Sequence, residues 1–140
     1  MTVSHFVTDL EVRWHTTDTS PDKRGTRSLL APLAYASDLL GRVLIVPGGF
    51  VTDFASVPRL PVAFLLAGDC AHEAAVCHDW LYSTHEVDRS MADAVFREAC
   101  LIGEPEWRAW LMWAGVRIGG SGPYHAKGQR QPAHIAPLMA

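Results

Sequence analysis

Two adjacent segments, C-H-D-W-L-Y-S-T-H (residues 77–85) and E-V-D-R-S-M-A-D-A-V-F (residues 86–96), decide how the second half of the chain folds. An Ala-rich run without Gly or Pro predicts a first helix over about 70–83. Asp88 can cap a second helix over about 89–102, and a third is expected over about 106–118. The short connection between the first two makes them antiparallel neighbours.

The first half of the chain predicts strands. Apolar residues fall on even positions from His5 to Trp14, the period of a half-buried strand. Residues 16–26 are turn formers and charges, which indicates a loop, and 29–36 and 42–46 are expected to form a pair of strands. Antiparallel strands followed by about three helices predict an α+β fold. We expect one compact domain over residues 1–125 and an extended tail over 126–140.

The composition excludes several classes of protein. The chain has 140 residues, 49% hydrophobic and 19% charged, with a net charge of -3, which describes a globular protein. No run of Lys or Arg predicts nucleic-acid binding, and no stretch reaches the ~18 apolar residues of a transmembrane helix. No signal peptide is visible. Cys70, Cys77 and Cys100 are an odd number, so we expect reduced and buried thiols.

A candidate catalytic site lies on the first two helices. His78 and Tyr82 are four residues apart and share a helix face, while Asp79 lies about 100° further round. The antiparallel packing can bring Asp93 against His78. An imidazole oriented by a carboxylate is a general base, so we expect His78 to be the base, with Asp93 and Tyr82 behind it.

Carboxylates near this site predict a divalent cation. Asp79 can hold a hard cation, and the Gly-rich loop over residues 47–56 supplies a second carboxylate, Asp53. Calcium is favoured over zinc, because the neighbouring carboxylates suit an oxygen-binding cation and the softer ligands within this short span match no zinc motif; these are His72, Cys77, His78 and His85.

Each of these residues also has a purely structural interpretation. Asp93 can pair with Arg89 or Arg97 on a helix face, and His78 can be a core histidine bonded to a carbonyl. Trp107, Trp110 and Trp113 recur every third residue on the third helix. The stripe is expected to face the core; the alternative is a surface where indole rings lie among lipid headgroups.

Four motifs resemble an uncharacterised domain family of tailed phages and prophages: G-F-V-T-D-F-A-S-V-P-R (49–59), H-D-W-L-Y (78–82), R-S-M-A-D-A-V-F (89–96) and V-R-I-G-G (116–120). The resemblance covers about residues 40–125 and implies a phage origin. H-D-x-x-Y followed by D-x-x-F is also similar to the core of phospholipase A2. That similarity implies that His78 is the general base and Asp79 the calcium ligand. It also implies that Tyr82 and Asp93 order the hydrogen bonds behind His78. The chain departs from it in a shorter gap between the helices, an upstream loop unlike the family's calcium loop, and the absence of bracing disulfides.

These observations predict a phage-encoded, metal-assisted hydrolase that acts on an ester or amide of the host envelope, most specifically a phospholipid ester. The alternative is a non-enzymatic virion or assembly protein, a tail or capsid accessory, in which the same motifs are structural. A binder of a small host signalling molecule is a third option. The hydrolase or its alternative would act in the host cytoplasm or within the virion. Exposure discriminates between the first two: if His78 and Asp79 open to a solvent pocket, the enzyme is favoured, and if both are buried with all their hydrogen bonds satisfied, the scaffold is favoured.

Overall fold

The strands come first in the chain and the helices last, which confirms the α+β prediction. A computed structural model of the chain describes residues 3–15, 26–52, 71–119 and 121, and all structural statements below concern these residues. The strands are β1 (His5–Phe6), β2 (Val12–His15), β3 (Thr26–Leu29), β4 (Leu33–Ser37), β5 (Arg42–Val46) and β6 (Val51–Thr52). The helices are α2 (Ala71–Thr84), α3 (Arg89–Cys100) and α4 (Glu106–Gly119).

The strands form two antiparallel three-stranded sheets, ordered β1-β4-β5 and β2-β3-β6. β4 and β5 are the expected pair, joined by a tight turn in which Gly41 has a φ of 67°. A residue with a side chain would be strained there. The expected start of β4 at Leu29 is wrong, because Leu29 ends β3 and pairs with Val12 in the other sheet.

The single strand expected over residues 5–14 is also wrong. It is split into β1, which pairs with β4, and β2, which pairs with β3. The chain crosses from one sheet to the other between them, so no single ladder can continue. The alternation still identified the inward face, since Phe6, Leu10 and Val12 pack against the core.

The helices begin and end close to their expected bounds. Asp88 is the N-cap of α3 as predicted, because its side chain accepts a hydrogen bond of 2.8 Å from the Met91 N–H. The expected loop over 16–26 lies outside the described residues except for Thr26, which begins β3. The tail over 126–140 also lies outside them.

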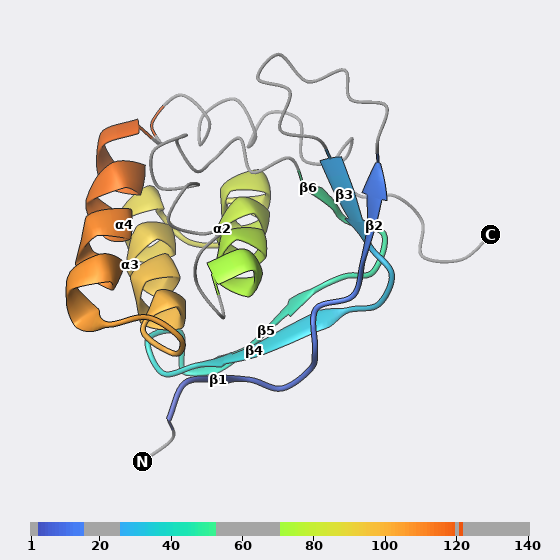
Figure 1. Cartoon of the computed structure of the whole chain (residues 1–140), viewed down its shortest axis with the longest axis horizontal. Coiled ribbons are helices and arrows are strands. Elements are labelled where there is room, and N and C mark those ends of the chain that lie inside the picture. The colour runs from blue at the N-terminus through green and yellow to red at the C-terminus, as the bar shows by residue number, and fades with distance from the viewer. Residues whose placement is uncertain (1–2, 16–25, 53–70, 120, 122–140) are drawn as a thin grey trace.

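Helix α2 is the centre of the molecule. Residues 74–83 are all buried, with α3 on one side of the helix and β5 and β6 on another, while α4 covers α3 (Figure 1). A helix that is covered on several sides must be apolar nearly all round, which the Ala-rich sequence of α2 supplies. The polar side chains of α2 therefore have to find partners inside the protein.

The tryptophan stripe does not face the core, contrary to expectation. Trp107 is 62% exposed and Trp110 is 45% exposed, while Trp113 is partly buried. The core face of α4 consists instead of Ala109, Met112 and Val116. These side chains are smaller than an indole and allow α4 to lie close against α3, and the larger indoles turn outward.

Two further findings bear on the sequence predictions. Cys77 and Cys100 are buried thiols, as expected, and Cys70 lies outside the described residues. In the described part of the chain, no helix is both long enough and apolar enough to cross a membrane.

Candidate functional site

Asp93 is the centre of a buried cluster that joins α2 to α3. Its Oδ1 lies 2.7 Å from Nε2 of His78 and accepts a hydrogen bond of 2.6 Å from the hydroxyl of Tyr82. His78 and Tyr82 lie one turn apart on α2, so both reach the same oxygen. The juxtaposition expected from the antiparallel helices is therefore present.

The second oxygen of Asp93 faces arginines. Arg117, from the last turn of α4, donates from Nη1 to Oδ2 at 2.9 Å, and Nε of Arg89 lies 4.0 Å from the same oxygen. The Nη2 of Arg89 also donates to the carbonyls of Val116 and Arg117, which holds the end of α4 against α3. Of the two arginines expected as partners, Arg89 is near Asp93, whereas Arg97 lies over the ring of Trp110.

Sequence reasoning missed Arg117 as a member of the cluster. The signal was available in the V-R-I-G-G segment, which contains it. Three of the four motifs quoted in the sequence meet at Asp93: H-D-W-L-Y supplies His78 and Tyr82, R-S-M-A-D-A-V-F supplies Asp93 itself, and V-R-I-G-G supplies Arg117.

The hydrogen bonds fix the protonation states of the cluster. Burial opposes ionisation of Asp93, but the hydrogen bonds from His78, Tyr82 and Arg117 outweigh it and lower the pKa of the carboxyl below its ordinary value. Burial, followed by the bond to Asp93, raises the pKa of Tyr82, so its hydroxyl stays protonated and donates. An ionised Asp93 can only accept, so Nε2 of His78 carries the proton, and in the neutral ring the lone pair is on Nδ1.

Asp79 belongs to a different contact. Its Oδ2 accepts a hydrogen bond of 2.6 Å from the hydroxyl of Thr52 in β6, which connects α2 to the second sheet. Thr52 directly precedes Asp53, the second predicted metal ligand, which lies outside the described residues.

The described side chains do not by themselves form a metal site. Among them, no three His, Cys, Asp or Glu side chains gather closely enough to hold an ion. The candidate zinc ligands are all in the described part of α2 and the turn after it; His85 is exposed, whereas Cys77 is buried and its thiol pKa is raised by desolvation. A carboxylate such as that of Asp79 fits calcium, which prefers oxygen ligands. Of the two predicted ligands, Asp79 is among the described residues and Asp53 is not.

The cluster is closed to solvent. His78, Tyr82 and Asp93 are 0% exposed and Asp79 is 1% exposed. The imidazole of His78 lies between the rings of Tyr82 and Phe96, with centroid distances of 4.1 and 4.9 Å. Under the exposure criterion set out above, this burial counts toward the structural interpretation, and the fixed His–Asp geometry counts toward the enzymatic one.

Comparison with known proteins identifies a family. None of the curated proteins and none of the solved structures matches the chain. Residues 27–116 match the model of a family described as a protein of unknown function, DUF1353. The match contains α2, α3 and most of α4, and therefore His78, Tyr82 and Asp93, while Arg117 follows its last residue. The chain belongs to the DUF1353 family.

Proposed function

We propose that the Asp93 cluster is the general-base site of a phage-encoded hydrolase that cleaves an ester or amide of the host envelope, most specifically a phospholipid ester. The observation that carries the proposal is the 2.7 Å contact between His78 Nε2 and Asp93 Oδ1. A carboxylate that orients one ring nitrogen of a histidine also stabilises the imidazolium that forms when the other nitrogen takes a proton.

In the proposed reaction, Nδ1 of His78 removes a proton from a water molecule as the water oxygen attacks the carbonyl carbon of the ester. The imidazolium that forms is stabilised by Asp93, and it returns the proton to the leaving alkoxide when the C–O bond breaks. One water and one ester thus give a carboxylic acid and an alcohol. Tyr82 keeps Asp93 in place by its hydrogen bond to Oδ1.

Calcium is part of the proposal. Asp79, together with Asp53, would hold the ion, which when bound would stabilise negative charge that develops on the carbonyl oxygen. Calorimetric titration of the purified protein should detect calcium binding, and Asp79→Asn should abolish it. Zinc serves as the comparison ion, and binding of calcium that survives Asp79→Asn would place the ion elsewhere.

His78→Gln tests the base most directly. The amide of Gln can still donate a hydrogen bond to Asp93, but it cannot accept a proton from water. We expect hydrolysis of phospholipid vesicles or peptidoglycan to fall by about 10²-fold or more, the usual contribution of a general base, while the melting temperature changes little. His5→Gln is the matched control, since His5 is exposed on β1. Retained hydrolysis in His78→Gln would remove His78 from the mechanism.

A second candidate function is supported by the burial of the cluster. In a non-enzymatic virion or assembly protein, Asp93 would serve only to tie three helices together, through His78 on α2, its own position on α3 and Arg117 on α4. The positive charge of Arg117 also offsets the negative charge of Asp93, which would otherwise stabilise an imidazolium at His78. Under this candidate the wild-type protein hydrolyses no envelope substrate, and the protein is found in purified particles.

A further inference from the structure

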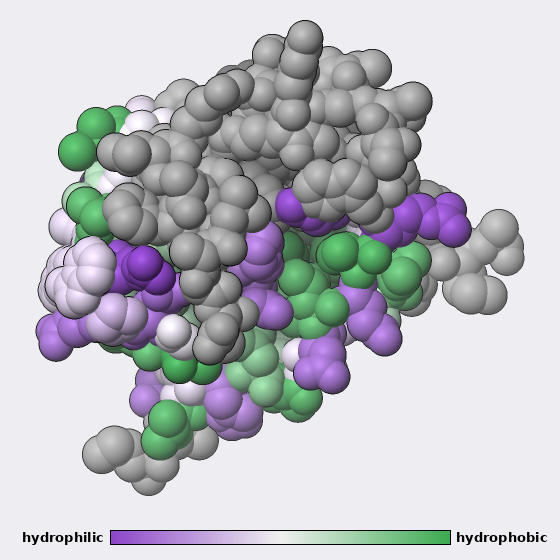
Figure 2. All heavy atoms as spheres, viewed as in Figure 1, coloured by the Kyte–Doolittle hydropathy of each residue, from purple (hydrophilic) through white to green (hydrophobic). Residues whose placement is uncertain are grey.

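The outer face of α4 is an apolar surface that faces no other described element. Its exposed apolar side chains are Trp107, Trp110, Leu111 and Ile118, which are 62%, 45%, 42% and 86% exposed. At about 100° per residue, Trp107, Leu111 and Ile118 fall within roughly 40° of one another on the helix. Pale and green spheres gather over α4 at the left edge of Figure 2. We call these four residues the outer face of α4.

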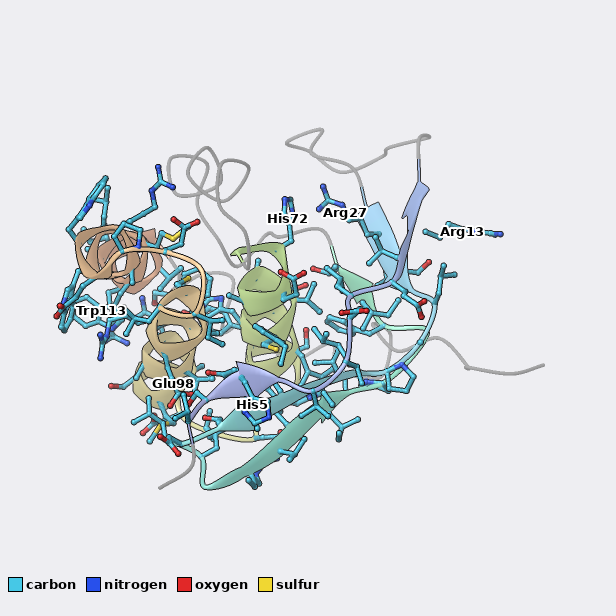
Figure 3. All side chains as sticks on the ribbon, turned by 60° about the horizontal axis from the view of Figure 1, so that its bottom comes forward. His5, Arg13, Arg27, His72, Glu98 and Trp113 are labelled. Atoms are coloured by element: carbon cyan, nitrogen blue, oxygen red, sulfur yellow. The ribbon has the colours of Figure 1, made fainter. Side chains whose placement is uncertain are left out.

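Helix α4 is apolar on both sides, which is unusual for a helix at the surface. Ala109, Met112 and Val116 fill its core face, roughly opposite the outer face. Surface helices normally carry charged and polar residues away from the core, whereas a helix that is apolar all round is normally covered. The outer face is therefore suited to a second apolar environment. Trp113, labelled in Figure 3, lies at the side of this face with its ring edge-to-face against Trp110 at 5.2 Å.

Two arginines lie beside the indoles of this face. The guanidinium of Arg97 lies 4.2 Å from the ring centroid of Trp110 and forms no ion pair with any described residue. The guanidinium of Arg108 lies 5.7 Å from Trp107 and pairs at 2.8 Å with Glu104, which is 7% exposed. A cation held over an exposed indole can bind an anion without leaving the ring.

We infer that the outer face of α4 docks onto an anionic lipid bilayer, with the indoles among the headgroups and Arg97 against a lipid phosphate. Indole rings with arginines beside them are the side chains that bind membrane interfaces, and an arginine that forms no ion pair with the described residues is suited to the phosphate of an anionic lipid. A second copy of the chain would present the same arginines, so charge complementarity favours the bilayer over self-association. The docking is inferred from this surface alone and does not depend on the proposed hydrolysis. Its role in bringing the protein to a phospholipid substrate rests on the proposed function.

Cosedimentation with vesicles tests the inference. The wild-type protein should bind vesicles that contain phosphatidylglycerol more tightly than pure phosphatidylcholine vesicles, and high salt should reduce this preference because it screens the phosphates. The double variant Trp107→Gln, Leu111→Gln should bind at least about tenfold more weakly, since it removes most of the apolar area that would be buried. Arg97→Gln should abolish the preference for the anionic lipid and leave the binding that the apolar side chains provide.

Ile45→Gln is the matched control. Ile45 is 49% exposed on β5, a strand that Figure 1 shows apart from α4, so its loss should leave vesicle binding unchanged. The inference is overturned if the wild type does not bind phosphatidylglycerol vesicles, or if Ile45→Gln weakens binding as much as the α4 double variant. It is also overturned if light scattering shows a dimer that the double variant dissociates, without vesicle binding by either protein.

His78→Gln separates this inference from the proposed function. That variant should bind the same vesicles as the wild type, because His78 is buried away from the outer face. Normal binding without any hydrolysis by the wild type would contradict only the proposed function. Hydrolysis of a soluble short-chain ester without vesicle binding would contradict only the docking of α4.

Discussion

Asp93 and Glu98 lie on the same helix, α3, and each accepts several hydrogen bonds, but their partners differ in kind. Oε1 of Glu98 accepts from the hydroxyls of Tyr35 and Ser37, both at 2.7 Å, and Oε2 accepts from the backbone N–H of Leu39 at 2.9 Å. These contacts fasten the β4–β5 turn to α3, and Figure 3 shows Glu98 on the side of α3 that faces the first sheet. Asp93 instead accepts from an imidazole, a tyrosine and an arginine of α2 and α4.

The two carboxylates differ in whether their hydrogen-bond donors can exchange a proton near neutral pH. The donors to Glu98 are neutral, and burial raises the pKa of Tyr35, so they keep their protons throughout the neutral range. Glu98 can therefore fix the turn but cannot take part in proton transfer with them. Asp93 has a histidine as partner, and histidine is the side chain that exchanges a proton near neutral pH. Several hydrogen bonds to one carboxylate therefore indicate a candidate catalytic site only when one of the donors can also act as a base.

The largest expected effect is on stability. Asp93→Ala should lower the free energy of unfolding by about 3–5 kcal/mol, because it leaves the buried side of Arg117 and the His78 ring without their acceptor. Glu98→Ala should cost less, about 2 kcal/mol, since Glu98 is itself only partly buried and its loss leaves neutral donors, not an arginine, without an acceptor. Urea denaturation of both variants checks the order. An equal or larger loss in Glu98→Ala would mean that the two carboxylates do the same structural work.

The juxtaposition of His78, Tyr82 and Asp93 in the candidate site could be predicted from the sequence because it depends on local geometry. The spacing of His78 and Tyr82 fixes one helix face, and the short connection to α3 leaves few ways to place Asp93. The cap at Asp88 is local as well. The fold class followed from strands preceding helices, which also needs no long-range contact.

The remaining features depend on contacts between distant segments. Arg117 reaches Asp93 only because α4 packs on α3, and Thr52 reaches Asp79 only because β6 lies beside α2. The expected strand over 5–14 is split because its two ends pair with different sheets. The tryptophans of α4 were placed inward because aromatic rings dominate cores, whereas the tight α3–α4 contact uses smaller side chains.

The second expected effect is the loss in acid of the contribution that Asp93 makes to stability. The pKa of Asp93 is lower in the folded chain than its ordinary value of 3.8. The unfolded chain therefore binds the proton more readily, so the contribution of Asp93 to stability is complete above the unfolded value and is lost as the pH falls through the folded one. We expect the stability difference between wild type and Asp93→Asn to be constant from about pH 7 to pH 5 and to narrow below about pH 4. Urea denaturation at each pH measures it, and a difference that persists unchanged at about pH 2.5 would contradict the ionised state of Asp93.

The smallest effect comes from two matched hydroxyls. Tyr82 donates to Asp93 at 2.6 Å and Tyr35 donates to Glu98 at 2.7 Å, and both rings are 0% exposed. Changing either tyrosine to Phe should cost about 1.5 kcal/mol, because in each case another donor remains on the same oxygen. Stability alone will therefore not separate them, but the ¹⁵N resonances of the His78 ring will. Tyr82→Phe should shift these signals, since His78 becomes the sole donor to that oxygen among the described side chains, and Tyr35→Phe should leave them in place. Equal shifts in both variants would show that α3 carries one coupled network rather than two separate clusters around Asp93 and Glu98.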